Sequence, residues 1–207
     1  MLTPVTASQK IRHLALGDSY TIGESVLENE RWPNQLSAIL TKKNFQTEVT
    51  IIARTGWTTE ELSQGIRANP PVGTYDLVSL LIGVNNQYRG NDADEYREQF
   101  RFLLIKSIEF AGGDANHVIV LSIPDWGVTP FAAGRNIEQI AKEIDNFNSI
   151  NREETVSLGA HYVDITPISR QVEGDSSLIA FDGLHPSGKM YKLWVEKAYP
   201  MVVEILK

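Results

Sequence analysis

The sequence predicts an α/β protein in which five parallel strands form a central sheet with helices on both faces. Five short apolar runs recur along the 207 residues, and each is long enough for a buried strand. Segments with apolar residues at helical spacing alternate with them, which is typical of a parallel sheet. Glycine and polar residues follow the runs. The predicted strands cover residues 11–16, 49–53, 77–82, 118–123 and 162–165.

Start signals and periodicity define the predicted helices. Thr58 and Glu61 have the spacing of a capping box, and Asp92 with Glu95 repeats it at the start of a longer helix. Pro33 suits the first turn of the helix that precedes the second strand. The predicted helices cover residues 31–42, 58–68, 92–108, 136–158 and 188–206.

Composition indicates an ordinary globular chain. Apolar residues make up 42% of it and charged residues 22%, so we expect one domain over residues 1–207, with residues 1–10 as an N-terminal extension. The formal charge of −7 argues against nucleic acid as a partner, and the absence of cysteine excludes disulfides and cysteine nucleophiles. The sequence has neither an apolar run long enough to cross a membrane nor a signal-peptide pattern. We therefore expect a cytoplasmic protein, or a secreted or periplasmic protein if a signal peptide was removed. The oligomeric state stays open.

In parallel sheets, ligands bind outside the carboxyl ends of the strands. The residues that follow each predicted strand, and the loop before the last helix, should therefore meet along one rim. These segments are Gly17-Asp18-Ser19-Tyr20, Arg54-Thr55-Gly56-Trp57, Gly83-Val84-Asn85-Asn86, Pro124-Asp125-Trp126 and Asp182-Gly183-Leu184-His185-Pro186.

Ser19 is the candidate nucleophile of this rim. A serine needs a base, and His185 is the histidine that falls in a rim loop, whereas the other three lie at or near strand starts. Asp182 stands three positions before His185, close enough to orient its ring. The alternative is that Ser19 or Asp18 only caps a helix and that the loop is structural. A metal site at Asp182 and His185 lacks further ligands, so neither a metal nor a cofactor is expected.

Acyl transfer also needs donors for the developing oxyanion. The backbone N–H of Ser19, the backbone N–H of Gly56 and the side-chain amide of Asn85 are the candidates, although Gly56 and Asn85 are also common turn residues.

In chain order, Gly17-Asp18-Ser19, Gly56, Gly83-Val84-Asn85 and Asp182-Gly183-Leu184-His185 resemble the four sequence blocks of the SGNH (GDSL-like) hydrolase family. The resemblance implies a flavodoxin-like three-layer α/β/α fold. It also implies a Ser19/His185/Asp182 triad and an oxyanion hole formed by Ser19, Gly56 and Asn85. The sequence departs from the family pattern twice: Tyr20 replaces the leucine of the GDSL signature, and Asn86 replaces a frequent aspartate.

The leading hypothesis is a serine esterase that hydrolyses carboxylic esters of short to medium acyl chain through a Ser19 acyl-enzyme. A thioesterase or lysophospholipase, a carbohydrate deacetylase and a binding module without turnover are the alternatives. Trp57, Tyr88, Trp126 and Leu184 are candidate substrate-binding residues, or else packing anchors of their loops. The short loops offer no lid, which favours soluble small-molecule esters over a lipid interface.

Overall fold

A computed structural model describes residues 9–207 and contains the expected five-stranded parallel sheet. The strand order is β2-β1-β3-β4-β5, which is the flavodoxin-like order and confirms the predicted fold class. The strands are β1 (Gln9–Gly17), β2 (Phe45–Ala53), β3 (Leu77–Leu81), β4 (Val118–Leu121) and β5 (His161–Val163).

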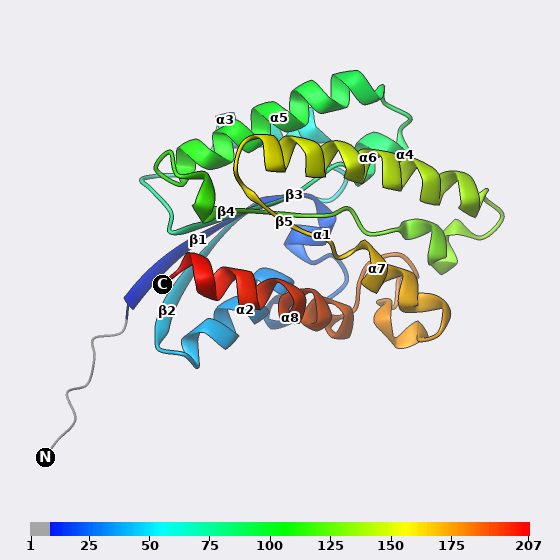
Figure 1. Cartoon of the computed structure of the whole chain (residues 1–207). Coiled ribbons are helices and arrows are strands. Elements are labelled where there is room, and N and C mark those ends of the chain that lie inside the picture. Colours follow the sequence, from blue (N-terminus) through cyan, green and yellow to red (C-terminus); the bar gives the residue numbers. More distant parts are fainter. Residues whose placement is uncertain (1–8) are drawn as a thin grey trace, which may run out of the picture.

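Helices cover both faces of the sheet (Figure 1), with α2 and α8 packed together on one face and α3, α5 and α6 on the other. The α-helices are α1 (Ser19–Ile22), α2 (Trp32–Thr41), α3 (Thr59–Ala68), α4 (Val84–Tyr88), α5 (Ala93–Phe110), α6 (Ile137–Ser157), α7 (Thr166–Ser169) and α8 (Gly188–Ile205). Short 3₁₀ helices are η1 (Glu28–Glu30), η2 (Ala115–His117), η3 (Trp126–Val128), η4 (Pro130–Ala132), η5 (Arg170–Glu173) and η6 (Ser176–Leu178). Within residues 9–207, no helix has both the length and the apolar character of a membrane span.

The cap signals act largely as the sequence predicts. The Thr58 hydroxyl accepts the Glu61 N–H, and the Glu61 carboxylate accepts the Thr58 N–H at 2.8 Å, which completes the capping box of α3. Asp92 caps α5 by accepting the N–H groups of the two residues at its second and third positions. Glu95 does not close a second box, because its carboxylate accepts the Gln99 amide at 2.8 Å instead.

Two predicted boundaries are wrong at the start of the sheet. β2 begins at Phe45, four positions before the apolar run, and β1 begins at Gln9, so Gln9 and Lys10 belong to the sheet rather than to an N-terminal extension. The remainder of the proposed extension lies outside the described residues. β2 is an edge strand, and residues 45–48 alternate between half-buried and exposed, so polar residues fit there. The Lys10 ammonium lies 3.2 Å from the Glu48 carboxylate across the two strands.

The sheet is buried at its centre, where every residue of β3 and β4 is inaccessible to solvent. The strand order reverses direction between β1 and β3, which lie side by side. In open α/β sheets, the crevice at this reversal is the usual ligand site. The residues after β1 and β3, which include Ser19 and Asn85, flank that crevice.

Candidate active site

The turn between β1 and α1 presents Ser19 to the crevice. Gly17 is the last residue of β1, and a larger residue does not fit there because a Cβ would collide with the Thr21 side chain and with the carbonyl oxygen of Leu81. Asp18, rather than Ser19, is the N-cap of α1, since its Oδ1 accepts the Tyr20 N–H at 3.0 Å. The Ser19 hydroxyl is thus not used as a cap, and its own N–H lies at the first helical position, where helices leave donors unpaired.

The carboxyl group of Asp18 is completely buried beside the candidate nucleophile. Its Oδ2 atom has no hydrogen-bond partner among residues 9–207. Burial disfavours the charged form and raises the pKa of Asp18 to about 7, despite the hydrogen bond from Tyr20. The turn beneath Ser19 therefore contains a carboxyl group that holds its proton into the neutral range.

His185 and Asp182 form a paired acid and base within one short turn. Nδ1 of His185 lies 2.6 Å from Oδ2 of Asp182. An ionised carboxylate can only accept, so Nδ1 carries the hydrogen and Nε2 of the neutral ring is left as a proton acceptor.

Four donors surround the Asp182 carboxylate. Oδ2 also accepts the Ser25 hydroxyl at 2.6 Å, and Oδ1 accepts the backbone N–H groups of Leu184 at 2.9 Å and His185 at 3.0 Å. Partial burial opposes ionisation, but the hydrogen bonds from Ser25, His185 and Leu184 outweigh it and hold the pKa of Asp182 well below its usual range. Asp182 is therefore a stable anion that can support a positive charge on His185.

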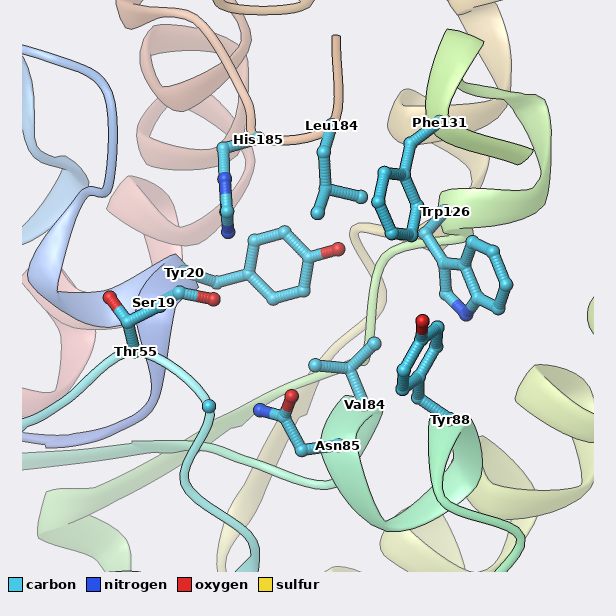
Figure 2. A pocket seen from close by; sticks show the side chains of 11 residues that line it. Ser19, Tyr20, Thr55, Val84, Asn85, Tyr88, Trp126, Phe131, Leu184 and His185 are labelled. Atoms are coloured by element: carbon cyan, nitrogen blue, oxygen red, sulfur yellow. The ribbon is translucent and has the colours of Figure 1, made fainter. Parts of the chain in front are cut away.

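Ser19 and His185 face each other at the edge of a cavity. Figure 2 shows the Ser19 hydroxyl on the side toward the tip of the His185 ring, and both residues line the same space. No hydrogen bond joins the two side chains within the described part of the chain. Catalytic hydrogen bonds are often long without substrate and tighten when it binds, so this arrangement is compatible with a serine and its general base.

The candidate oxyanion donors lie next to this pair. Gly56 adopts a φ of 85°, a left-handed conformation that favours glycine, and its carbonyl oxygen accepts the Arg89 guanidinium at 2.6 Å. Arg89 is itself paired with Glu61 at 3.2 Å, which fixes the loop. Asn85 donates one amide hydrogen to the Trp57 carbonyl at 3.0 Å, which leaves its second hydrogen for another acceptor.

Asn86, the second departure from the family pattern, has a structural role. Its side chain is fully buried and makes two hydrogen bonds to Thr59, the first residue of α3. It accepts the Thr59 N–H at 3.0 Å and donates to the Thr59 hydroxyl at 2.7 Å. This pair fixes the start of α3 against α4, the helix that carries Asn85.

The cavity between these groups measures about 180 Å³. Three expected substrate-binding residues line it, namely Tyr88, Trp126 and Leu184, together with every candidate residue of the triad and oxyanion hole except Asp182, which lies behind His185. Tyr20, Thr55 and Val84 line it as well; they belong to the predicted rim segments, although no substrate-binding role was predicted for them. Phe131 also lines it and belongs to none of those segments.

Trp57 does not line the cavity, which argues against a role in substrate binding. Its ring packs against α3, where a side chain at Gly65 would collide with it. Of the two roles considered for this residue, the structure favours the packing anchor. Gly56 therefore lines the cavity, whereas the ring of its neighbour Trp57 points away from it.

An aromatic wall closes one end of the cavity (Figure 2), and we define it as Tyr88, Trp126 and Phe131. The ring of Trp126 packs edge-on against Tyr88 and Phe131, with centroids 5.4 and 6.0 Å apart. The Arg135 guanidinium lies 5.1 to 5.5 Å from all three ring centroids, and it donates to the Tyr88 hydroxyl at 3.0 Å. Cation–π attraction to three faces holds the wall together.

The other histidines lie away from the cavity. His13 is buried in β1, where Nε2 contacts the Ser79 hydroxyl at 2.9 Å and burial lowers the pKa of the ring to about 3. His117 contacts the Asp76 carbonyl through Nδ1 at 2.7 Å, and His161 begins β5.

Comparison with known proteins agrees with this architecture. The sequence pattern of the GDSL-like lipase/acylhydrolase family matches residues 15–193. No curated protein matches the sequence. Among solved structures, TesA superimposes with a TM-score of 0.73 at 17% identity, covering 94% of this chain and 99% of the other.

Two esterases are similar in structure at comparable identity. The psychrotrophic esterase EstA from Pseudoalteromonas sp., solved with monoethylphosphonate as inhibitor, gives a TM-score of 0.69 at 18% identity, covering 94% of this chain and 98% of that one. The acetylxylan esterase Axe2 from Geobacillus stearothermophilus gives 0.72 at 16% identity, covering 95% and 96%. At these identities the similarity establishes the fold.

Proposed function

Since the chain belongs to the GDSL-like lipase/acylhydrolase family, we propose that it is a serine esterase that hydrolyses carboxylic esters through an acyl-enzyme on Ser19. The observation that carries the proposal is the free Ser19 hydroxyl facing a His185 ring whose other nitrogen is bonded to Asp182 at 2.6 Å. A nucleophile and an oriented base thus meet in one cavity, and a partly buried anion lies behind the base.

In the proposed first step, the Ser19 oxygen attacks the ester carbonyl carbon and His185 Nε2 takes the hydroxyl proton. The carbonyl oxygen becomes an oxyanion that accepts hydrogen bonds from the Ser19 N–H, the Gly56 N–H and the Asn85 amide. Collapse of this intermediate breaks the bond to the alcohol, which leaves with the proton from His185.

In the second step, water attacks the acyl-enzyme while His185 takes one of its protons. The second oxyanion collapses, the acid is released, and the proton returns to Ser19. Asp182 stays ionised throughout, in keeping with its lowered pKa, and stabilises the imidazolium that forms twice in the cycle.

The cavity supports a preference for short to medium acyl chains. Its volume of about 180 Å³ is smaller than the ~300–1,000 Å³ of typical ligand pockets, and the aromatic wall closes one end. Each buried methylene contributes ~0.8 kcal/mol, so activity should rise with chain length until the cavity is full and then fall. A p-nitrophenyl ester series from acetate to palmitate, below and above the micellar threshold, tests this. A maximum at palmitate, or a jump at micelle formation, would instead indicate a lipase.

Covalent labelling tests the proposed nucleophile. A fluorophosphonate should modify Ser19, as located by mass spectrometry, and Ser19→Ala should abolish both labelling and ester turnover. Ser149→Ala, which removes a hydroxyl from the surface of α6, is the matched control and should behave as the unaltered protein does. An adduct on another residue, or turnover in Ser19→Ala, would refute the assignment.

A further inference from the structure

Tyr20, the residue that departs from the GDSL signature, extends from the nucleophile turn into the cavity. Its side chain is only 3% exposed, yet it is part of the cavity lining. Figure 2 shows the ring beside Ser19 and His185, with the hydroxyl at its far end, toward Leu184 and Phe131. The ring packs edge-on against His185 at a centroid distance of 5.8 Å. The family leucine would fill similar space without any polar atom.

The Tyr20 hydroxyl has no hydrogen-bond partner among residues 9–207, yet it is not sealed from the cavity. Two other buried tyrosines, in helices α5 and α8, differ from it. The Tyr96 hydroxyl contacts the Asn151 side chain at 2.7 Å and the Ile82 carbonyl at 3.2 Å. The Tyr191 hydroxyl is unpaired and fully enclosed by protein. The Tyr20 hydroxyl is unpaired too, but it is not fully enclosed. Tyr20 therefore offers a free donor and acceptor to whatever fills the cavity.

The surroundings of this hydroxyl are mainly apolar; the Tyr88 hydroxyl in the aromatic wall, which accepts a hydrogen bond from Arg135, is a polar exception. The cavity side chains at this end, beyond the reacting groups, include Val84, Leu184 and the rings of Trp126 and Phe131. A plain alkyl chain placed here would displace water and leave the Tyr20 hydroxyl unpaired, which is unfavourable. A substrate oxygen at the same place would pair with it. Sites that hydrogen-bond a substrate hydroxyl discriminate against analogues that lack it.

We propose that Tyr20 selects esters whose cavity-bound part carries a hydrogen-bonding oxygen, a hydroxyl or a second carbonyl, in addition to the scissile carbonyl. This inference rests on the proposed esterase function and narrows its substrate class. The oxygen belongs to the acyl part or to the alcohol part of the ester, according to which of them occupies the cavity. In either case the Tyr20 hydroxyl replaces the water that the oxygen loses on binding.

The test compares matched ester pairs. In the acyl arm, a 3-hydroxybutyrate ester is compared with the butyrate ester of the same alcohol; in the alcohol arm, glyceryl butyrate is compared with propyl butyrate. The measured quantity is the ratio of kcat/KM within each pair. We expect the oxygenated ester to be preferred in one arm, and Tyr20→Phe to reduce that preference by roughly 3- to 10-fold, as expected for a neutral hydrogen bond. Tyr20→Leu, which restores the signature residue, should reduce the preference as well.

Tyr199→Phe is the matched control, because it removes a tyrosine hydroxyl from α8 outside the cavity; its ratio should equal that of the unaltered protein. Fluorophosphonate labelling of Ser19 verifies that each variant has a folded site. Turnover without an oxygen preference in either arm, or a preference that survives both Tyr20 substitutions, would overturn the role of Tyr20 and leave the esterase proposal standing. Absence of both turnover and Ser19 labelling in the unaltered protein would refute the esterase proposal itself, and this inference with it.

Discussion

Asp182→Asn removes the charge behind the proposed base while preserving the shape of its side chain. The remaining oxygen can still accept the N–H groups of Leu184 and His185, now at 2.9 and 3.0 Å, so the turn should keep its conformation. The new amide nitrogen takes the place of Oδ2, 2.6 Å from Nδ1 of His185. As a donor, it makes Nδ1 an acceptor and moves the ring hydrogen to Nε2. A ring in this tautomer cannot take the proton of Ser19.

The expected loss is about 10⁴-fold in kcat, the cost of the wrong tautomer in a serine triad, which corresponds to roughly 5 kcal/mol in the barrier. KM should change little because Asp182 does not line the cavity. His185→Ala should reduce kcat at least as much, since it removes the proton acceptor itself. Steady-state hydrolysis of a soluble p-nitrophenyl ester gives both constants.

Asp175→Asn is the matched control for this experiment. Asp175 is also an acceptor in a short turn, bonded to Ser177 and to Lys189 at 2.5 Å, but it lies outside the cavity. Its substitution should leave kcat within about twofold, because an exposed ion pair contributes little. An Asp182→Asn variant that keeps an unaltered circular dichroism spectrum and more than about a tenth of kcat would refute the role of Asp182 as partner of the base.

Three further predictions concern the oxyanion donor, the buried carboxyl and the aromatic wall. Asn85→Ala should lower kcat by ~10²–10³ and leave KM nearly constant, because the donor acts on the transition state; a raised KM at constant kcat would make Asn85 a binding residue. Between about pH 4 and the raised pKa of Asp18, about 7, the folded chain holds a proton that the unfolded chain releases, so stability falls as pH rises through this window. In urea titrations, the free energy of unfolding of the unaltered protein should drop by about 1.4 kcal/mol per pH unit relative to that of the Asp18→Asn variant. The same pH dependence in both proteins would contradict this prediction. Arg135→Ala removes the cation that contacts all three rings of the wall and should move the optimum of the ester series to longer chains; an unchanged optimum would refute this role.

Apolar runs and cap residues were sufficient to predict the sheet and the long helices. Fully buried strands such as β3 and β4 appear in the sequence as unbroken apolar segments. The start of β2 was missed because an edge strand admits polar residues, such as Glu48, which lies beside Lys10 of β1. The short helix α4 has five residues, too few for a periodic pattern.

The candidate site could be predicted as far as it depends on strand ends. Ser19 and the loop of His185 meet at the crevice because parallel strands end at one edge of the sheet. Which aromatic ring faces the cavity depends on distant packing: Trp57 turns away because Gly65 leaves space for it on α3. Phe131 was not predicted, because its position depends on a hydrogen bond from its N–H to the Gly183 carbonyl, 3.0 Å away in another loop.

The candidate nucleophile follows the first strand of the chain, whereas its base and the partner of that base precede the last helix, α8. A nascent chain still emerging from the ribosome would therefore expose Ser19 long before it has a proton acceptor, and it would stay inert until the final segment folds against α2. Ester turnover would thus report that the chain has folded as far as α8. A cut in any loop between the two ends would yield fragments that are each inactive, and recovered turnover on mixing them would measure their reassembly.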